Sequence, residues 1–330
     1  MKIGPIGVQL GDDRIKIAQL ASTGDKIQVV EMISVPTPSG SIIGGYVKVP
    51  RVAGDVIGKA IAESKFQGRK AIIAHPTEIL QVQIMSLTES QNLDNTIASR
   101  LAQMAFEHPE ELTFDYKIIA RDEGKVKAIV AITNKRHIAR MSEMAVEARL
   151  TLAGTDLEML SIFRLVTACY KISTNPILLA LSEGTTLKLA LFVQKVLAQV
   201  KTTELTSSLR ADPKTAAIEI GRFLEEYRRG NFLTESPTIF IAGLSESDFS
   251  TEKIIWETVD LPTTSIRWCE AFTLSHTYTN FSELVMRFGA FSCALGLSLA
   301  DLPLPQNYRT PIIVDVRQPG FTPELLRFEV

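Results

Sequence analysis

Residues 6–20, IGVQLGDDRIKIAQL, decide the fold, because residues 178–192, LLALSEGTTLKLALF, repeat their pattern. In both stretches a β-rich apolar run leads into a short polar turn with a glycine, Gly11 or Gly184, and a second β-rich run follows. This arrangement is typical of a β-hairpin. A third β-rich run follows each hairpin, over residues 26–35 and 196–201. The repeat predicts an internal duplication with two related halves.

Outward from the two hairpins, strand-like and helix-like patterns alternate, which predicts an α/β fold. In the first half we expect a helix over 52–66, with Ile57 and Ile61 on its apolar stripe, and a buried strand over 70–74. In the second half the expected strands cover 238–242 and 265–268, and the expected helices cover 213–229, 251–259 and 281–299.

Residues 78–152 read as a separate small α/β unit inserted into the first half. We expect its strands over 79–87, 112–120 and 126–133 and its helices over 90–106 and 135–150. Each helix has one apolar stripe and a charged opposite face. The predicted domains are therefore 1–77 with 153–172, the insertion 78–152, a second domain 173–300, and an extended proline-rich tail 301–330.

The composition is that of a folded and nearly neutral protein. Of 330 residues, 45% are hydrophobic and 22% are charged. A chain of this length and apolar content can bury a large core. The net charge of -2 provides no field that would attract nucleic acid or anionic lipid. The N-terminus has no signal-peptide pattern, and we identify no apolar run of membrane-span length. We therefore expect a cytoplasmic protein without direct membrane insertion.

The sequence contains no familiar catalytic or metal-binding pattern. None of the four histidines has metal-ligand spacing to another: His75, His108, His137 and His276. The three cysteines, Cys169, Cys269 and Cys293, lie far apart without CxxC spacing. We interpret them as buried free thiols, with a metal or redox site as the alternative. We predict no catalytic residue and no metal ligand.

Three glycine turns are candidate anion-binding loops. Backbone N–H groups in a tight turn converge on an anion, and a β-hairpin holds them rigid. Besides the two hairpin turns, a third turn follows the predicted strand 238–242. If a nucleotide binds, the candidate cofactor-binding residues are Gly11, Asp12, Asp13, Gly184, Thr185, Thr186, Gly243, Leu244 and Ser245.

These segments, in their order and separations, resemble the PilM family. The resemblance rests on the two hairpins and on IIAHPTEILQVQIMSL (72–87), IFIAGLS (239–245) and FSCALGLSLA (291–300), and it covers most of residues 1–300. PilM proteins are cytoplasmic, actin-like components of type IV pilus machines and are related to the cell-division protein FtsA. The resemblance implies a two-domain actin-like (ribonuclease H-like) fold with an inserted subdomain in the first domain.

The resemblance also implies a partner. PilM proteins bind the short cytoplasmic N-terminal segment of the membrane protein PilN in a groove beside the inserted subdomain. Here the groove residues would be Ile79, Leu80, Val82, Ile84, Leu93 and Ile97. By the same resemblance the chain would be recruited to the inner membrane through this partner. It would also contact other pilus or type II secretion platform proteins, and self-association is conceivable.

Several positions depart from the family pattern at the nucleotide loops. The family has aspartate where this chain has Gln9 and Ser182, small hydroxyl residues at Asp12 and Asp13, and a glycine pair at Gly243 and Leu244. A carboxylate about 4 Å from a phosphate oxygen costs roughly 4 kcal/mol at an effective dielectric near 20. The neutral residues remove two possible Mg²⁺ ligands, and Leu244 adds bulk near the nucleoside. We therefore expect no bound ATP.

Alternatives stay open at this point. Asp12 or Asp13 could turn inward and hold Mg²⁺ together with ATP. Asp156 and Glu158 fall where the family places acidic cleft residues, or they are a helix N-terminal pair favoured by the helix dipole. Three hypotheses follow: a scaffold that has lost its ATPase activity, an ATP-binding protein whose nucleotide state switches partner binding, and a sugar-kinase-like enzyme.

Overall fold

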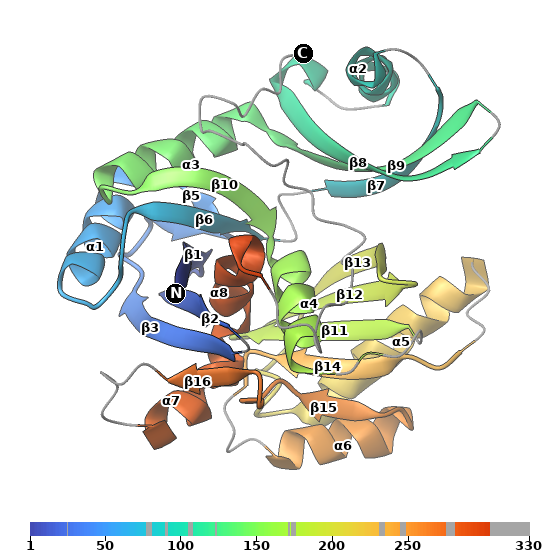
Figure 1. The fold of residues 1–330 in the computed structure, drawn as a ribbon. Helices are drawn as coiled ribbons and strands as arrows, with labels where there is room; N and C mark the ends of the chain where they lie inside the picture. Colours follow the sequence, from blue (N-terminus) through green and yellow to red (C-terminus); the bar gives the residue numbers. More distant parts are fainter. Residues whose placement is uncertain are drawn as a thin grey trace.

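A computed structural model describes the chain over residues 1–24, 26–76, 81–89, 92–104, 108–122, 124–170, 172, 176–230, 235–244, 249–274 and 281–303. The chain forms two lobes, with a smaller unit above them (Figure 1). The first lobe is a six-stranded sheet with the helices that cover it, and the second lobe is a five-stranded sheet with its helices. The smaller unit, residues 81–134, is called the insert.

The sheet of the first lobe has the order β10-β6-β1-β2-β3-β16. Its strands are β1 (Lys2–Leu10), β2 (Arg14–Thr23), β3 (Lys26–Pro36), β6 (Lys70–His75), β10 (Thr151–Leu157) and β16 (Phe272–Leu274). The first three form the antiparallel meander that the hairpin pattern predicted, and the other three run parallel to a neighbour. Alternating residues of β1, including Ile6 and Val8, pack under α1 (Pro50–Ala62) and α3 (Lys135–Glu147).

The sheet of the second lobe has the order β13-β12-β11-β14-β15. Its strands are β11 (Ile177–Glu183), β12 (Thr186–Val193), β13 (Val196–Glu204), β14 (Thr238–Ala242) and β15 (Thr263–Ser265). One face packs on α5 (Pro213–Gly230) and α6 (Phe249–Val259), through residues such as Leu189 and Phe223. Asp212 caps the start of α5 by accepting a 3.1 Å hydrogen bond from the backbone N–H of Thr215.

The two sheets repeat one topology, as the duplicated sequence pattern predicted. In each sheet a three-stranded antiparallel meander, β1-β2-β3 or β11-β12-β13, is extended at its first strand by parallel strands. The added strands are β6 and β10 in the first lobe and β14 and β15 in the second. A glycine turn joins the first two strands of each meander. The two turns therefore occupy equivalent positions in the two lobes.

Two helices lie between the lobes and carry the main core: α4 (Glu158–Cys169) and α8 (Ser292–Ser298). All side chains of α4 are buried, and the ring of Phe163 stacks on Phe192 of β12 with centroids 4.1 Å apart. The predicted continuous helix over 281–299 is instead divided into α7 (Phe281–Arg287), η2 (Phe288–Phe291), α8 and η3 (Leu299–Asp301). Gly289 and Gly296 lie against backbone oxygens, which explains their lack of a side chain.

The expectation that no segment has the length and apolarity of a membrane span is wrong for Ser282–Asp301. Among the described residues, this helical stretch meets both criteria, and 67% of the window is buried inside the fold. It packs on β1, β2 and α4 as the shared core helix of the two lobes. Its apolar composition is therefore explained by internal packing.

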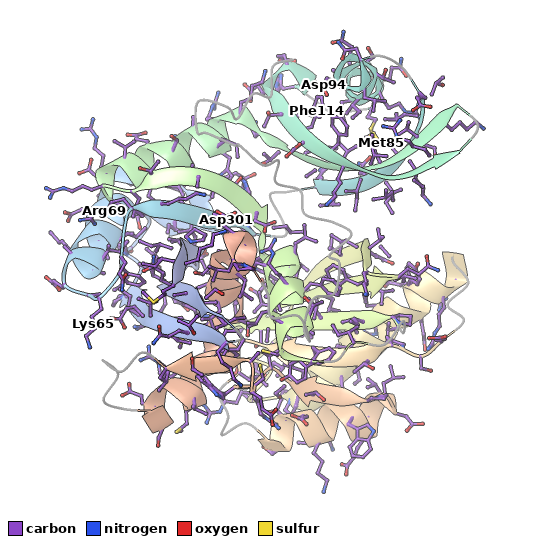
Figure 2. The ribbon with its side chains drawn as sticks, viewed as in Figure 1. Lys65, Arg69, Met85, Asp94, Phe114 and Asp301 are labelled. Atoms are coloured by element: carbon purple, nitrogen blue, oxygen red, sulfur yellow. The ribbon has the colours of Figure 1, made fainter. Side chains whose placement is uncertain are left out.

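The insert is a three-stranded antiparallel sheet with one helix on its far side. Its elements are β7 (Gln81–Thr88), α2 (Leu93–Gln103), η1 (Pro109–Glu111), β8 (Leu112–Asp122) and β9 (Lys125–Asn134), and the sheet order is β7-β9-β8. Figure 2 shows Met85 and Phe114 between this sheet and α2. Together with Ile97 they form a small separate core. The short pair β4 (Ile42–Ile43) and β5 (Tyr46–Val47) completes the fold.

Besides the short pair β4 and β5, the sequence pattern missed β10 and β16, which bear on the domain boundaries. Strand β10 joins the first sheet directly after α3, and β16 returns from the second half to pair with β3. The division of the chain at 173–300 stays a prediction, but β16 and α8 pack with the first sheet. The strand predicted over 265–268 lies at Thr263–Ser265 instead. Residues 304–330 of the predicted tail lie outside the described residues.

The contact between α8 and α4 provides a test of this packing. A Cβ added at Gly296 would lie 1.8 Å from the backbone oxygen of Ser161. We therefore expect Gly296→Ala to reduce the free energy of unfolding by ~1–3 kcal/mol. Gly221 in α5 is the control, because a Cβ there meets nothing within 4 Å. Gly221→Ala should be neutral or stabilise by up to ~1 kcal/mol. Urea unfolding of both variants measures the difference, and equal free energies would contradict the packing.

Candidate functional site

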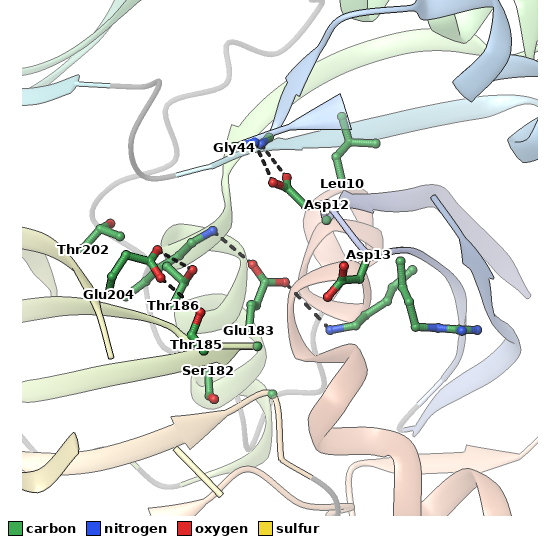
Figure 3. A pocket seen from close by; sticks show the side chains of 17 residues that line it. Leu10, Asp12, Asp13, Gly44, Ser182, Glu183, Thr185, Thr186, Thr202 and Glu204 are labelled. Atoms are coloured by element: carbon green, nitrogen blue, oxygen red, sulfur yellow. Dashed lines mark hydrogen bonds and ion pairs between the residues drawn. The ribbon is translucent and has the colours of Figure 1, made fainter. Parts of the chain in front are cut away.

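The glycine turns of the two lobes face each other across one cleft of about 600 Å³ (Figure 3). The structure thus brings together the β1–β2 turn, the β11–β12 turn and Gly243, three features that are far apart in the sequence. The cleft is lined by Leu10, Gly11, Asp12, Asp13, Arg14, Lys16, Gly44, Gly45, Ser182, Glu183, Gly184, Thr185, Thr186, Lys188, Thr202, Glu204 and Gly243.

Asp12 is held by a loop of its own lobe. Its Oδ2 accepts a 2.8 Å hydrogen bond from the N–H of Gly44, and its Oδ1 accepts a 3.2 Å bond from the N–H of Gly45 (Figure 3). Both carboxylate oxygens are therefore directed at the turn between β4 and β5. Asp13 is exposed, and its carbonyl accepts a hydrogen bond from the N–H of Thr37. The alternative that Asp12 turns inward to hold Mg²⁺ would require these bonds to break.

The hydroxyl groups of the second turn are also engaged. Thr186 Oγ1 donates a 2.7 Å hydrogen bond to Glu204, and Thr185 Oγ1 donates a 3.2 Å bond to the other oxygen of the same carboxylate. Glu204 ends β13, which pairs with β12 up to Thr186. This carboxylate places a negative charge beside Gly184, the turn residue with positive φ.

The third turn differs from the prediction at Leu244. Its side chain is 6% exposed and packs in the core between the second sheet and α5 and α6, so it adds no bulk to the cleft. That part of the argument against a nucleoside is wrong. Gly243 does line the cleft, has a φ of 89°, and could not carry a Cβ because the carbonyl oxygen of Ser182 lies 2.2 Å from where it would be. Ser245 lies outside the described residues.

A chain of polar and charged side chains joins the two lobes at the cleft. Glu183 Oε1 accepts a 2.6 Å hydrogen bond from Gln9 of β1 and lies 3.9 Å from Lys16 of β2. Its Oε2 lies 3.0 Å from Lys188 of β12. Lys188 also pairs at 2.9 Å with Glu158, the first residue of α4. We call Gln9, Lys16, Glu158, Glu183 and Lys188 the cleft bridge.

The two acidic residues before and at the start of α4 have separate roles. Asp156 is buried and pairs at 2.7 Å with Arg164, whose other nitrogen donates to the carbonyl of Gly296. Glu158 belongs to the cleft bridge through Lys188. The helix dipole is therefore not the sole partner of either carboxylate. Both are ion-paired inside the fold, Asp156 within the first lobe and Glu158 to a residue of the second lobe.

The charges of the cleft do not favour a triphosphate. Four carboxylates and three cationic side chains line it, and the buried lysine is shared by two carboxylates. An anion with several charges would meet a lining that is acidic in sum. Within the described part of the chain, no group of three or more histidine, cysteine or acidic side chains is arranged to hold a metal ion.

The predicted partner-binding residues separate onto two faces of the insert. Ile97 is fully buried under the sheet, and Leu93 lies half-buried on the same helix. Val82 and Ile84 are on the opposite face of β7, where Val82 packs against the main core and Ile84 is 41% exposed. Leu93 and Ile97 therefore lie on the other face of the sheet from Ile84, and the groove expected beside the insert stays a prediction. Ile79 and Leu80 lie outside the described residues.

Two of the scattered histidines meet near the cleft. His75 ends β6 and His137 lies in α3, and their ring centroids are 5.2 Å apart beside Tyr46. Burial lowers the pKa of His75 to about 3 and that of His137 to about 4. Both rings are therefore neutral at pH 7 and provide no positive charge for a phosphate group.

Sequence reasoning missed the bridge residues Lys16, Glu183 and Lys188. One signal was available in the sequence. Lys188 interrupts an apolar run, with Leu187 before it and LALF (189–192) after it. A lysine inside a buried strand requires a charged partner, because an unpaired buried ammonium is strongly disfavoured. The identity of the partners, Glu158 and Glu183, depends on the approach of the lobes and is not encoded locally.

Removal of the central lysine tests the bridge. Lys188→Met keeps most of the side-chain volume but removes the lysine that forms an ion pair with Glu158, which is 2% exposed. We expect a loss of roughly 3–5 kcal/mol in the free energy of unfolding, as is typical when one member of a buried ion pair is removed. The control is Lys201→Met, since Lys201 pairs with Glu226 on the surface. That change should cost no more than about 1 kcal/mol. Equal losses by chemical denaturation would refute a buried, energetically coupled bridge.

Comparison with known proteins bears on the fold. No protein-family model matches the chain, and no curated protein matches it. A chain of a PilM-PilN type IV pilus biogenesis complex matches with a TM-score of 0.73 and 16% identity, over 91% of this chain and 98% of that one. The ethanolamine utilization protein EutJ from Carboxydothermus hydrogenoformans matches with a TM-score of 0.51 and 9% identity, over 91% and 90%. The chain therefore has the two-domain, actin-like α/β fold with an inserted subdomain that its sequence predicted.

Proposed function

We propose that this chain is a scaffold of a type IV pilus or type II secretion assembly platform, and that it binds a membrane partner but has lost ATPase activity. The fold shared with a chain of the PilM-PilN complex supports the assembly role. The cleft bridge is the observation that carries the loss of ATPase activity. Gln9, Glu183 and Lys188 already link the turns of the two lobes, where a nucleotide and its metal ion would otherwise do so.

Binding of ATP would require the bridge to open. A phosphate group between the turns would have to displace Glu183 from Gln9 and Lys188, and a metal ion would compete with Lys188 for the same carboxylates. The negative charge of Glu204 would remain beside the second turn. Each of these three effects opposes the binding of a triphosphate. Together they favour the state in which the protein's own side chains link the lobes.

One observation favours the alternative of a nucleotide-dependent switch. Three glycine turns, with Gly11, Gly184 and Gly243, still converge on a cleft of about 600 Å³. If Glu183 turned away, Lys16 and Lys188 would be placed to contact phosphate oxygens. In this alternative the bridge is the resting state and ATP replaces it, so that partner affinity follows the nucleotide.

For the partner, we propose that an extended peptide adds to the open edge of β7. In the described part of the insert, β7 pairs only with β9, so its other edge retains unpaired backbone groups. A peptide strand placed there would form main-chain hydrogen bonds, and Ile84 would provide an apolar contact on the face toward the lobes. The N-terminal segment of an inner-membrane protein has the right form for this role, and it would recruit the chain to the membrane from the cytoplasm.

Peptide binding tests the proposal at Ile84. The probe is a synthetic peptide of the cytoplasmic N-terminal segment of the membrane protein encoded beside this chain, titrated by calorimetry. We expect Ile84→Asp to weaken binding more than about tenfold, because burying an isoleucine side chain contributes about 1.5–3 kcal/mol. Val146 of α3, 71% exposed and outside the insert, is the control, and Val146→Asp should bind as the wild type does.

Two results would count against this partner site. Undiminished binding by Ile84→Asp would remove β7 from the interface, and equal weakening by Val146→Asp would show a nonspecific effect of charge. Circular dichroism of both variants confirms that the lobes and the insert stay folded. Absence of any binding by the wild type would overturn the scaffold proposal itself.

A further inference from the structure

Two cysteines that are 100 positions apart in the sequence meet where the chain crosses between the lobes. Cys169 is the last residue of α4, after which the chain enters the second lobe. Cys269 lies on the return path, between β15 of the second sheet and β16 of the first. Both are free thiols, each shifts the pKa of the other, and Cys269 packs against the core cluster that contains Cys169. The interpretation of the three cysteines as separate buried thiols is therefore incomplete.

The return path is anchored to a different lobe at each end. Ile266 donates its N–H to Ile241 of the second sheet. A few residues later, Lys26 Nζ donates to the carbonyl of Glu270, and the N–H of Ile27 donates to Ala271, which ties this end to the first sheet. The crossing thus falls between residues 266 and 270. Cys269 lies inside it.

The outgoing path is bonded to the same segment by its next residue. The hydroxyl group of Tyr170 accepts a 3.1 Å hydrogen bond from the N–H of Arg267 and lies 3.4 Å from the carbonyl oxygen of Ser265. Cys169 and Tyr170 therefore contact the return path side by side. The two crossings form one hinge, and the thiol pair is part of it.

The two thiols have different surroundings. Cys169 is buried, whereas Cys269 is only partly buried. Burial raises the pKa of Cys169. The neighbouring Cys169 lowers the pKa of Cys269, as do the backbone N–H of Ala271 and the charge of Lys26, while partial burial and the charge of Glu270 act in the opposite direction. The less buried thiol is thus the better nucleophile, and the buried one lies next to it.

We propose that Cys269 is a peroxide-reactive thiol, that Cys169 is its resolving partner, and that the resulting disulfide fixes the hinge between the lobes. This inference does not depend on the proposed function. In the first step the Cys269 thiolate attacks one oxygen of hydrogen peroxide, the O–O bond breaks, and hydroxide leaves, so that the sulfur is oxidised to a sulfenic acid. In the second step the sulfur of Cys169 attacks the sulfur of Cys269. The S–O bond breaks, and the proton of Cys169 leaves with the hydroxide as water.

The disulfide joins the outgoing and the return path covalently. In the reduced chain the two paths are held at this point by hydrogen bonds of Tyr170 and by the thiol contact. A rotation of one lobe against the other shifts these paths relative to each other, since the chain passes from lobe to lobe here. The oxidised hinge resists that shift, and reduction by a dithiol restores it.

Mass spectrometry of the full chain tests the proposal, with Cys293→Ser as the matched control. Cys293 is fully buried in α8 and hydrogen-bonded to Ser161, away from the hinge. After treatment with hydrogen peroxide, wild type and Cys293→Ser should each lose two hydrogens, and peptide mapping should find Cys169 linked to Cys269. The melting temperature of both should rise, and dithiothreitol should reverse the rise.

The single variants separate the two roles. Cys169→Ser should gain one oxygen at Cys269, captured by dimedone, and should form no disulfide. Cys269→Ser should show neither change at the same peroxide dose, and its melting temperature should stay constant. Oxidation of Cys269→Ser as fast as wild type would overturn the assignment of the reactive thiol. A wild type that forms no disulfide while Cys269 accumulates oxygen would overturn the resolving role of Cys169.

Discussion

One buried lysine ties the two lobes together at the cleft. Lys188, in a strand of the second lobe, is shared between Glu158 at the start of α4 and Glu183 at the hairpin turn, and Glu183 in turn binds Gln9 of the first lobe. Buried charges of this kind persist only when they are paired, so the lobes have one favoured approach. That approach places the glycine turns face to face and lines the cleft between them with the protein's own charges.

The rest of the fold supplies the frame for this contact. Two meanders of the same topology present equivalent turns, and α4 and α8 form an apolar layer between them. The chain crosses this layer twice, at Tyr170 and at residues 266–270, and both crossings meet at the thiol pair. The cleft bridge and the hinge thus hold the lobes at two separate places. The insert stands apart from both, with its own small core and an open strand edge.

The sequence predicted the periodic parts of this structure and missed those that arise from long-range pairing. The hairpins and the duplication follow from local apolar patterns, and the resemblance to PilM named the fold correctly. The predicted insertion 78–152 also included α3, which packs on the first lobe. Strand β16 is three residues long, and its partner β3 lies far away in the sequence, so no local pattern marks it. Leu244 was expected near a nucleoside because the PilM family has a glycine pair at Gly243 and Leu244, but its side chain turns into the core. The partners of Lys188 and the contact of Cys169 with Cys269 exist only once both lobes are built.

The central claim is that the protein's own charges occupy the place of a nucleotide. Thermal unfolding with saturating ATP, with and without Mg²⁺, tests it most directly, because a ligand that binds the native state at a hundred times its Kd stabilises it by about 2.7 kcal/mol. The cleft bridge predicts the same melting temperature in both conditions and in the absence of ATP. A rise of several degrees that requires Mg²⁺ would contradict the account and would show that the bridge opens to admit a nucleotide.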